Sequence, residues 1–118
     1  MDARLDDQAI AAKVAALPGW VYERGWLRRE YKTDGWAQTL LVVNAIAFLS
    51  EAAYHHPDLA VTWARVEVKL MTHSAGGITD KDFELARRLD ALVLWTPDPG
   101  AALTGPPNPL ARASVRPA

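Results

Sequence analysis

Proline limits where this 118-residue chain can form regular structure. Six of its eight prolines fall after residue 95, in the segment TPDPGAALTGPPNPLARASVRPA. Proline lacks a backbone N–H and clashes with the preceding helical turn, so this segment cannot sustain a helix or an inner strand. The sequence therefore predicts one folded domain over residues 1–95, followed by an extended or disordered tail over residues 96–118.

The composition excludes several classes of protein. Half of the residues are hydrophobic and 23% are charged, as in ordinary soluble globular proteins. The net charge of -1 gives no general attraction to nucleic acid or an anionic membrane, and the basic stretch RGWLRREYK is typical of a strand with a solvated face. The chain has no cysteine, so it has no disulfides and no cysteine-based metal site.

Targeting and membrane segments are not predicted either. The first ten residues are acidic and lack the basic-then-apolar build of a signal peptide. No apolar run approaches the roughly 20 residues that span a bilayer. We therefore expect a cytoplasmic protein with no nucleic-acid and no membrane partner.

The first half of the domain predicts a helix, a hairpin and a second helix. Residues 5–17 are rich in alanine, carry acidic residues in the first turn and stop at a Pro-Gly pair, as helices do. Residues 20–24 and 26–32 alternate large and polar side chains about Gly25, which indicates a β-hairpin. Residues 36–55 form an apolar helix with so little polar surface that we expect it to be buried on more than one side.

The second half predicts another hairpin and a last helix. Residues 59–63 and 65–72 alternate with period two. A helix then follows over residues 79–94, with a buried stripe formed by Phe83, Ala86, Leu89 and Val93. Hairpin-joined strands are antiparallel, so we predict an α+β domain with a four-stranded antiparallel sheet and three helices on one face, in the order α-β-β-α-β-β-α. The sheet edges and the uncovered face favour a homo-oligomer.

All three histidines lie near the ends of predicted elements, in EAAYHHPDLAVTW and KLMTHSAGGITDKD. Pro57 disfavours the α conformation at His56, so the helix should end at about His55 with His56 already in the turn. Successive helical side chains point about 100° apart, so these two rings should splay rather than converge. His73 shares the strand register of charged residues, which argues against a packed core histidine, and the glycines of SAGG after it indicate a turn.

Asp82 has two compatible interpretations. Thr79 and Asp82 resemble a capping box at the start of the last helix, with Asp in place of the usual Glu or Gln. A carboxylate in this first turn also suits the positive end of the helix dipole. The same carboxylate could orient a histidine or fix its tautomer.

The three histidines raise two kinds of chemistry. Zinc accepts three imidazoles and a water, which would make a metal-dependent hydrolase, but adjacent histidines rarely converge on one ion. Imidazole titrates at about pH 6.5 and can give or take a proton at neutral pH. Acid–base catalysis without a metal or cofactor therefore fits better, and metal analysis of the purified protein separates the two hypotheses.

One spaced pattern joins these residues, and it consists of Glu51, His55, His56, Pro57, Trp63, His73 and Asp82. The pattern resembles the signature of the pterin-4a-carbinolamine dehydratases, and it covers residues 51–82. The order of predicted elements over about residues 5–95 is also similar to the fold of that family. The resemblance implies a lyase that removes water from 4a-hydroxytetrahydrobiopterin to give quinonoid dihydrobiopterin. This reaction recycles the pterin cofactor of aromatic amino acid hydroxylases.

The resemblance also implies roles for individual residues. His55 and His73 are similar to the family's acid–base pair, and His56 to its main pterin contact. Asp82 would orient a histidine, while Glu51 and Trp63 would shape the substrate site. For Trp63, plain packing against the sheet is an equally good explanation.

Two further expectations depend on the family. Its members are dimers or tetramers, which implies the same for this chain. Some of its relatives are non-enzymatic binding proteins, acting as dimerisation partners of a transcription factor or as helpers in RuBisCO assembly, so a binding role is the alternative to catalysis. The intact histidine set favours the enzyme, because a protein that only presents a surface does not need it.

Overall fold

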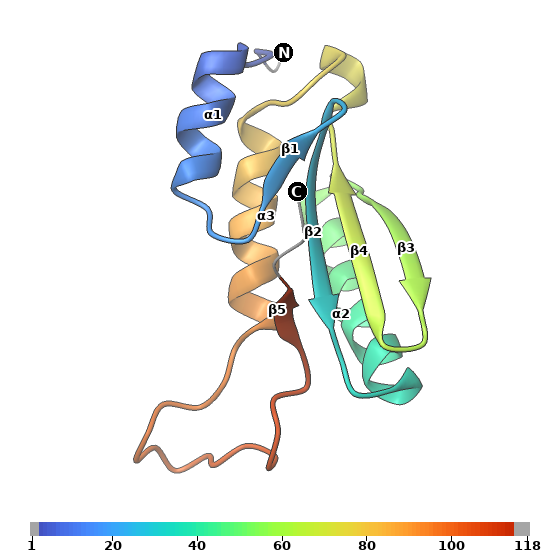
Figure 1. The fold of residues 1–118 in the computed structure, drawn as a ribbon, viewed down its shortest axis with the longest axis vertical. Helices are drawn as coiled ribbons and strands as arrows, with labels where there is room; N and C mark the ends of the chain where they lie inside the picture. Colours follow the sequence, from blue (N-terminus) through green and yellow to red (C-terminus); the bar gives the residue numbers. More distant parts are fainter. Residues whose placement is uncertain (1–2, 115–118) are drawn as a thin grey trace.

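The computed structural model describes residues 3–114 and places three α-helices against one antiparallel sheet (Figure 1). The elements in chain order are α1 (Asp7–Ala15), β1 (Val21–Glu23), β2 (Trp26–Lys32), α2 (Trp36–Ala53), β3 (Asp58–Thr62), β4 (Arg65–Leu70), the 3₁₀ turn η1 (His73–Ala75), α3 (Asp80–Val93) and β5 (Arg112–Ser114). The predicted α+β class with three helices is therefore confirmed.

The sheet has five strands, so the prediction of four is wrong. Its path runs β1-β2-β4-β3, and β5 pairs with β2 beside β1. The short β1 pairs only with residues 26–28 of β2, which leaves the same edge open over residues 30–32. β5 occupies this opening, with Ala113 opposite Tyr31. The fifth strand thus protects backbone groups that an edge strand would otherwise expose.

β5 comes from the proline-rich segment that was predicted to be extended or disordered. After α3 the chain runs away from the domain in an irregular loop and returns along β2 (Figure 1). Ala111 is buried where the chain returns, and the Arg112 guanidinium lies 3.0 Å from the Asp34 carboxylate. The five described prolines of this segment lie in the loop, and β5 begins only after Pro109. Residues 115–118 of the predicted tail lie outside the described residues.

The core lies between the sheet and the helices α2 and α3. Alternate side chains of β2 and β4 point inward, and the fully buried ones are Leu27, Tyr31, Val66, Val68 and Leu70. They form one hydrophobic cluster with buried residues of the two helices, including Ile46, Phe83, Ala86 and Leu89. The period-two and helical patterns of the sequence therefore identified the inner faces correctly, because burial of apolar area selects them.

Helix α2 buries only one of its faces, contrary to the expectation of burial on several sides. Its buried residues are Thr39, Val42, Ile46 and Ser50. The opposite face is exposed and largely apolar, with Trp36, Leu41 and Phe48 between 49% and 76% exposed. By length and composition α2 could cross a membrane, but its packing on the sheet is also what a core helix shows.

Candidate active site

Helix α2 ends where the two adjacent histidines begin. Tyr54 adopts the left-handed conformation with φ 54° and ψ 42°, and the backbone N–H of His55 donates to the carbonyl of Ser50 at 3.1 Å. This arrangement closes the helix and reverses the chain direction. His55 and His56 both lie beyond the helix, so the turn comes slightly earlier than Pro57 predicted.

His55 pairs with the predicted carboxylate of the last helix. Its Nε2 lies 2.7 Å from Oδ1 of Asp82. The imidazole is 13% exposed, whereas the Asp82 side chain is completely buried. His55 therefore has one nitrogen directed at a buried acceptor while part of its ring still reaches solvent.

The Asp82 carboxylate is fixed by two further donors. Its Oδ2 accepts from the hydroxyl of Thr72 at 2.8 Å and from the backbone N–H of Thr79 at 2.9 Å. The Thr79 hydroxyl caps the helix in return, so the predicted capping box is confirmed. An ionised carboxylate only accepts hydrogen bonds, so it selects the His55 tautomer that donates from Nε2 and leaves the Nδ1 lone pair free.

His56 occupies a more open position. Its Nε2 lies 2.7 Å from Oε1 of Glu51, and the two side chains are 54% and 76% exposed. The ring of Tyr54 meets it edge-on at 5.8 Å between centroids. The structure thus brings Glu51 and His56 together at the surface, next to His55.

His73 lies at the far end of β4, in the first position of η1. Its ring is exposed and meets Trp26 edge-on, with centroids 5.8 Å apart. The ammonium of Lys69 lies 4.5 Å from the centroid of the same Trp26 ring. Strand pairing ends at Leu70, so the register argument does not extend to His73, although the ring is exposed as that argument predicted.

The histidines gather at one end of the sheet. His73 follows Thr72 in the chain, Thr72 donates to Asp82, and Asp82 pairs with His55. This end is where β4 finishes and β3 begins (Figure 1). Trp63 lies at the opposite end, in the turn between those strands, with its ring over Gly35. Within this chain the structure therefore does not bring Trp63 to the histidines.

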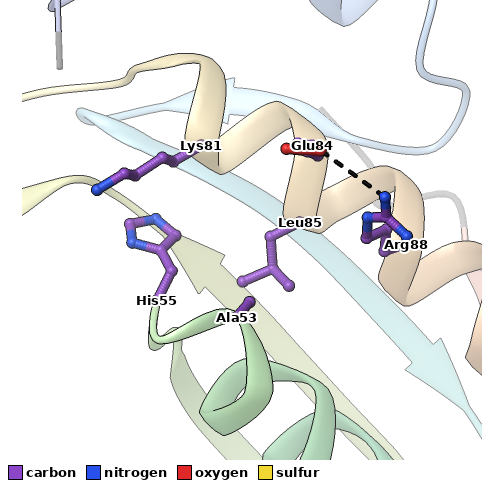
Figure 2. Close-up of a pocket in the computed structure, with 6 residues that line it drawn as sticks. All are labelled: Ala53, His55, Lys81, Glu84, Leu85 and Arg88. Carbon is purple, nitrogen blue, oxygen red and sulfur yellow. Dashed lines mark ion pairs between the residues drawn. The ribbon is translucent and has the colours of Figure 1, made fainter.

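A pocket of about 350 Å³ opens beside His55, between the end of α2 and the first turns of α3. Figure 2 shows its lining, which consists of Ala53, His55, Lys81, Glu84, Leu85 and Arg88. Glu84 pairs with Arg88 at 3.8 Å along the helix, and the Lys81 side chain extends past the imidazole. These α3 side chains were not predicted from the sequence. Only the position of Lys81 next to Asp82 could have pointed to one of them.

The arrangement suits proton transfer. Within residues 3–114, no three His, Asp or Glu side chains converge in a geometry that could hold a metal ion. What the site offers instead is one imidazole oriented by a buried carboxylate, two exposed imidazoles nearby and cationic side chains beside a pocket. This set can donate and accept protons around a small polar molecule.

Comparison with known proteins shows which family the chain resembles. The model of the pterin 4 alpha carbinolamine dehydratase family matches residues 3–92. The chain belongs to this family. A relative from Aquifex aeolicus is 44% identical over 90 residues, which are 76% of this chain and 91% of the relative. A relative from Thermomicrobium roseum is 43% identical over 90 residues, 76% of this chain and 97% of its own length. Both carry the provisional name pterin-4-alpha-carbinolamine dehydratase.

Two solved structures of the family have a similar fold. A transcriptional coactivator/pterin dehydratase from Brucella melitensis has a TM-score of 0.70 and 31% identity, over 75% of this chain and 97% of that one. A pterin dehydratase-like protein described as a RuBisCO assembly factor in the α-carboxysome has a TM-score of 0.51 and 26% identity, over 62% of this chain and 84% of that one. The family match ends at residue 92, so β5 lies outside it.

Proposed function

We propose that the protein is a hydro-lyase that dehydrates 4a-hydroxytetrahydrobiopterin to quinonoid dihydrobiopterin and so recycles the cofactor of aromatic amino acid hydroxylases. The observation that supports this most directly is the 2.7 Å pair between His55 and the buried Asp82. Membership of the dehydratase family supports the substrate class.

The reaction needs one proton donor and one proton acceptor. The C4a–O bond breaks, the departing hydroxide takes a proton and leaves as water, the N5–H proton is lost, and a C4a=N5 double bond forms. In this proposal His55 and His73 supply the acceptor and the donor, and His56 holds the pterin ring. Asp82 favours His55 as the acceptor, because a carboxylate on Nε2 stabilises the imidazolium that forms when Nδ1 takes a proton.

The pair can be tested with His55→Ala, His73→Ala and the double variant. Stopped-flow ultraviolet spectra of a decaying 4a-carbinolamine measure turnover directly. Each single variant should lose roughly 10²-fold, since acid–base assistance is worth about 10²- to 10⁴-fold, and the double variant should show the uncatalysed rate. His56→Ala is the matched control, which should raise KM more than it lowers kcat. Full dehydratase activity in the folded double variant contradicts the assignment.

Self-association is the second part of the proposal. The exposed apolar face of α2, with Phe48 76% exposed, is the surface we propose a second copy covers. Light scattering should show a dimer or tetramer that Phe48→Glu dissociates without loss of helical circular dichroism. A monomeric native protein contradicts it.

A binding role, as described for the RuBisCO assembly factor, is the alternative if the histidine variants keep their function. The cytoplasmic location stays a prediction.

A further inference from the structure

The open face of the sheet carries its charges in rows that run across the strands. In the antiparallel register, Arg28 of β2 lies opposite Lys69 of β4, and the next outward pair is Glu30 opposite Glu67. The third pair is Lys32 opposite Arg65. Basic, acidic and basic rows therefore follow one another from the histidine end of the sheet toward the start of α2.

The third row is the most strongly cationic of these rows, and β5 extends it. Arg112 of β5 lies opposite Lys32, and Thr62 of β3 lies opposite Arg65. Three cations thus occupy neighbouring positions on three hydrogen-bonded strands. Like charges directly opposite one another destabilise a sheet, so their placement calls for compensation.

The carboxylates among residues 3–114 compensate this row only in part. Asp34 lies 3.0 Å from Arg112, and Glu30 lies 3.7 Å from Arg65. Within residues 3–114 the Lys32 ammonium has no ion-pair or hydrogen-bond partner. One full positive charge therefore remains between two guanidinium groups whose side chains are 50% and 44% exposed.

The row also lines a shallow depression of about 530 Å³. Its lining residues are Lys32, Thr33, Thr62, Ala64, Arg65 and Arg112, and none of them is acidic. Thr33 leads into α2, whose first turn contains no acidic residue, and Asp34, just before its N-cap, pairs with Arg112. The depression combines guanidinium and ammonium donors, which are the groups that hold a phosphate.

We propose that this row is a binding site for the phosphate group of a small molecule, separate from the histidine site and completed by the C-terminal strand. It lies at the opposite end of the sheet from η1, where β2 leads into α2 (Figure 1). Arg112 lies beyond residue 92, where the family match ends, so the complete row depends on the part of the chain outside that match. The site does not depend on the dehydratase reaction.

Calorimetric titration of the full chain with inorganic phosphate and pyrophosphate, at low and moderate salt, tests the proposal. We expect saturable binding of one pyrophosphate per chain that weakens as salt rises. Arg112→Gln and Lys32→Gln should each weaken it about tenfold, because a charge-assisted hydrogen bond is lost. Arg112→Lys should retain most of the affinity. Arg87→Gln, an exposed cation on α3, is the matched control and should change nothing.

Amide chemical shifts locate the binding independently of affinity. Pyrophosphate should perturb residues around 32, 65 and 112, and the His55→Ala variant should bind it as the native protein does. Three affinity results each overturn the proposal: no saturable binding of either anion, equal weakening by the Arg87 control, or unchanged affinity in the Arg112→Gln variant with its fold intact. Perturbation confined to the histidine end also overturns it.

Discussion

Helix α3 carries two carboxylates eight residues apart that have opposite surroundings. Asp82 is fully buried, but its partner His55 is partly exposed. Asp90 is 21% exposed, but its three hydrogen-bond partners are buried. They are the indole N–H of Trp20 at 2.9 Å, the guanidinium of Arg29 at 2.7 Å and the hydroxyl of Tyr31 at 2.6 Å.

This contrast separates a site from a structural anchor. Each carboxylate accepts three hydrogen bonds, so the number of bonds does not distinguish them. The difference is whether a partner can exchange a proton with a molecule from solvent. His55 can, whereas Arg29 is 3% exposed and does not lose its proton in proteins. In the proposed reaction Asp82 orients His55, whereas Asp90 fastens α3 to β2 and to Trp20, which lies just before β1.

Removing the charge of Asp90 should cause the largest loss of unfolding free energy. In Asp90→Asn the single amide oxygen can replace only one of the two carboxylate oxygens that Trp20 and Tyr31 use, and the buried Arg29 loses its counter-charge. Breaking a buried ion pair from one side costs about 3 to 5 kcal/mol, and the partial exposure of Asp90 favours the lower end. Urea unfolding should show a loss of about 3 kcal/mol. Turnover per folded molecule should stay near the native value, and a loss of less than 1 kcal/mol contradicts the anchor role.

The same substitution at Asp82 should act on the reaction instead. Asp82→Asn keeps the size of the side chain but presents an amide that can direct its N–H₂ toward His55 and favour the wrong tautomer. We expect turnover to fall about 10²-fold, with a smaller loss of stability than in Asp90→Asn. Stopped-flow dehydration and urea unfolding of both variants give the comparison. Native turnover in Asp82→Asn would show that Asp82 serves only as a helix cap and does not orient His55.

Sequence spacing identified Asp82 as a candidate functional residue but gave no indication of the role of Asp90. The capping box of Thr79 and Asp82 is a contact between neighbours three residues apart, so spacing alone predicted it. The anchor around Asp90 joins residues 59 to 70 positions away, which no local pattern contains. The sequence raised the possibility that Asp82 orients a histidine and the family resemblance implied it, and the hydrogen bond to His55 is consistent with both.

The fifth strand and the open face of α2 could not be predicted for a related reason. Whether residues 112–114 pair depends on the vacancy that the short β1 leaves beside β2, which is a tertiary property. The prolines before it indicated an extended or disordered segment, and this pattern gave no sign of the strand after it. The apolar pattern of α2 predicted several buried sides, but one chain supplies neighbours for only one of them.

The smallest expected effect concerns pH and tests the anchor without removing a charge. Burial of Tyr31, together with the Asp90 carboxylate that its hydroxyl donates to, raises the pKa of that hydroxyl far above its ordinary value of 10.0. Above pH 10 the unfolded state loses the Tyr31 proton while the folded state keeps it. The stabilisation that Tyr31 contributes is therefore complete below pH 10 and declines above it. Between pH 10 and 11 the native protein should lose about 1 kcal/mol more unfolding free energy than Tyr31→Phe. Tyr54→Phe, at an 84% exposed position, should follow the native curve. Parallel curves for the native protein and Tyr31→Phe would mean that Tyr31 ionises freely in the folded state, which the short bond to Asp90 does not allow.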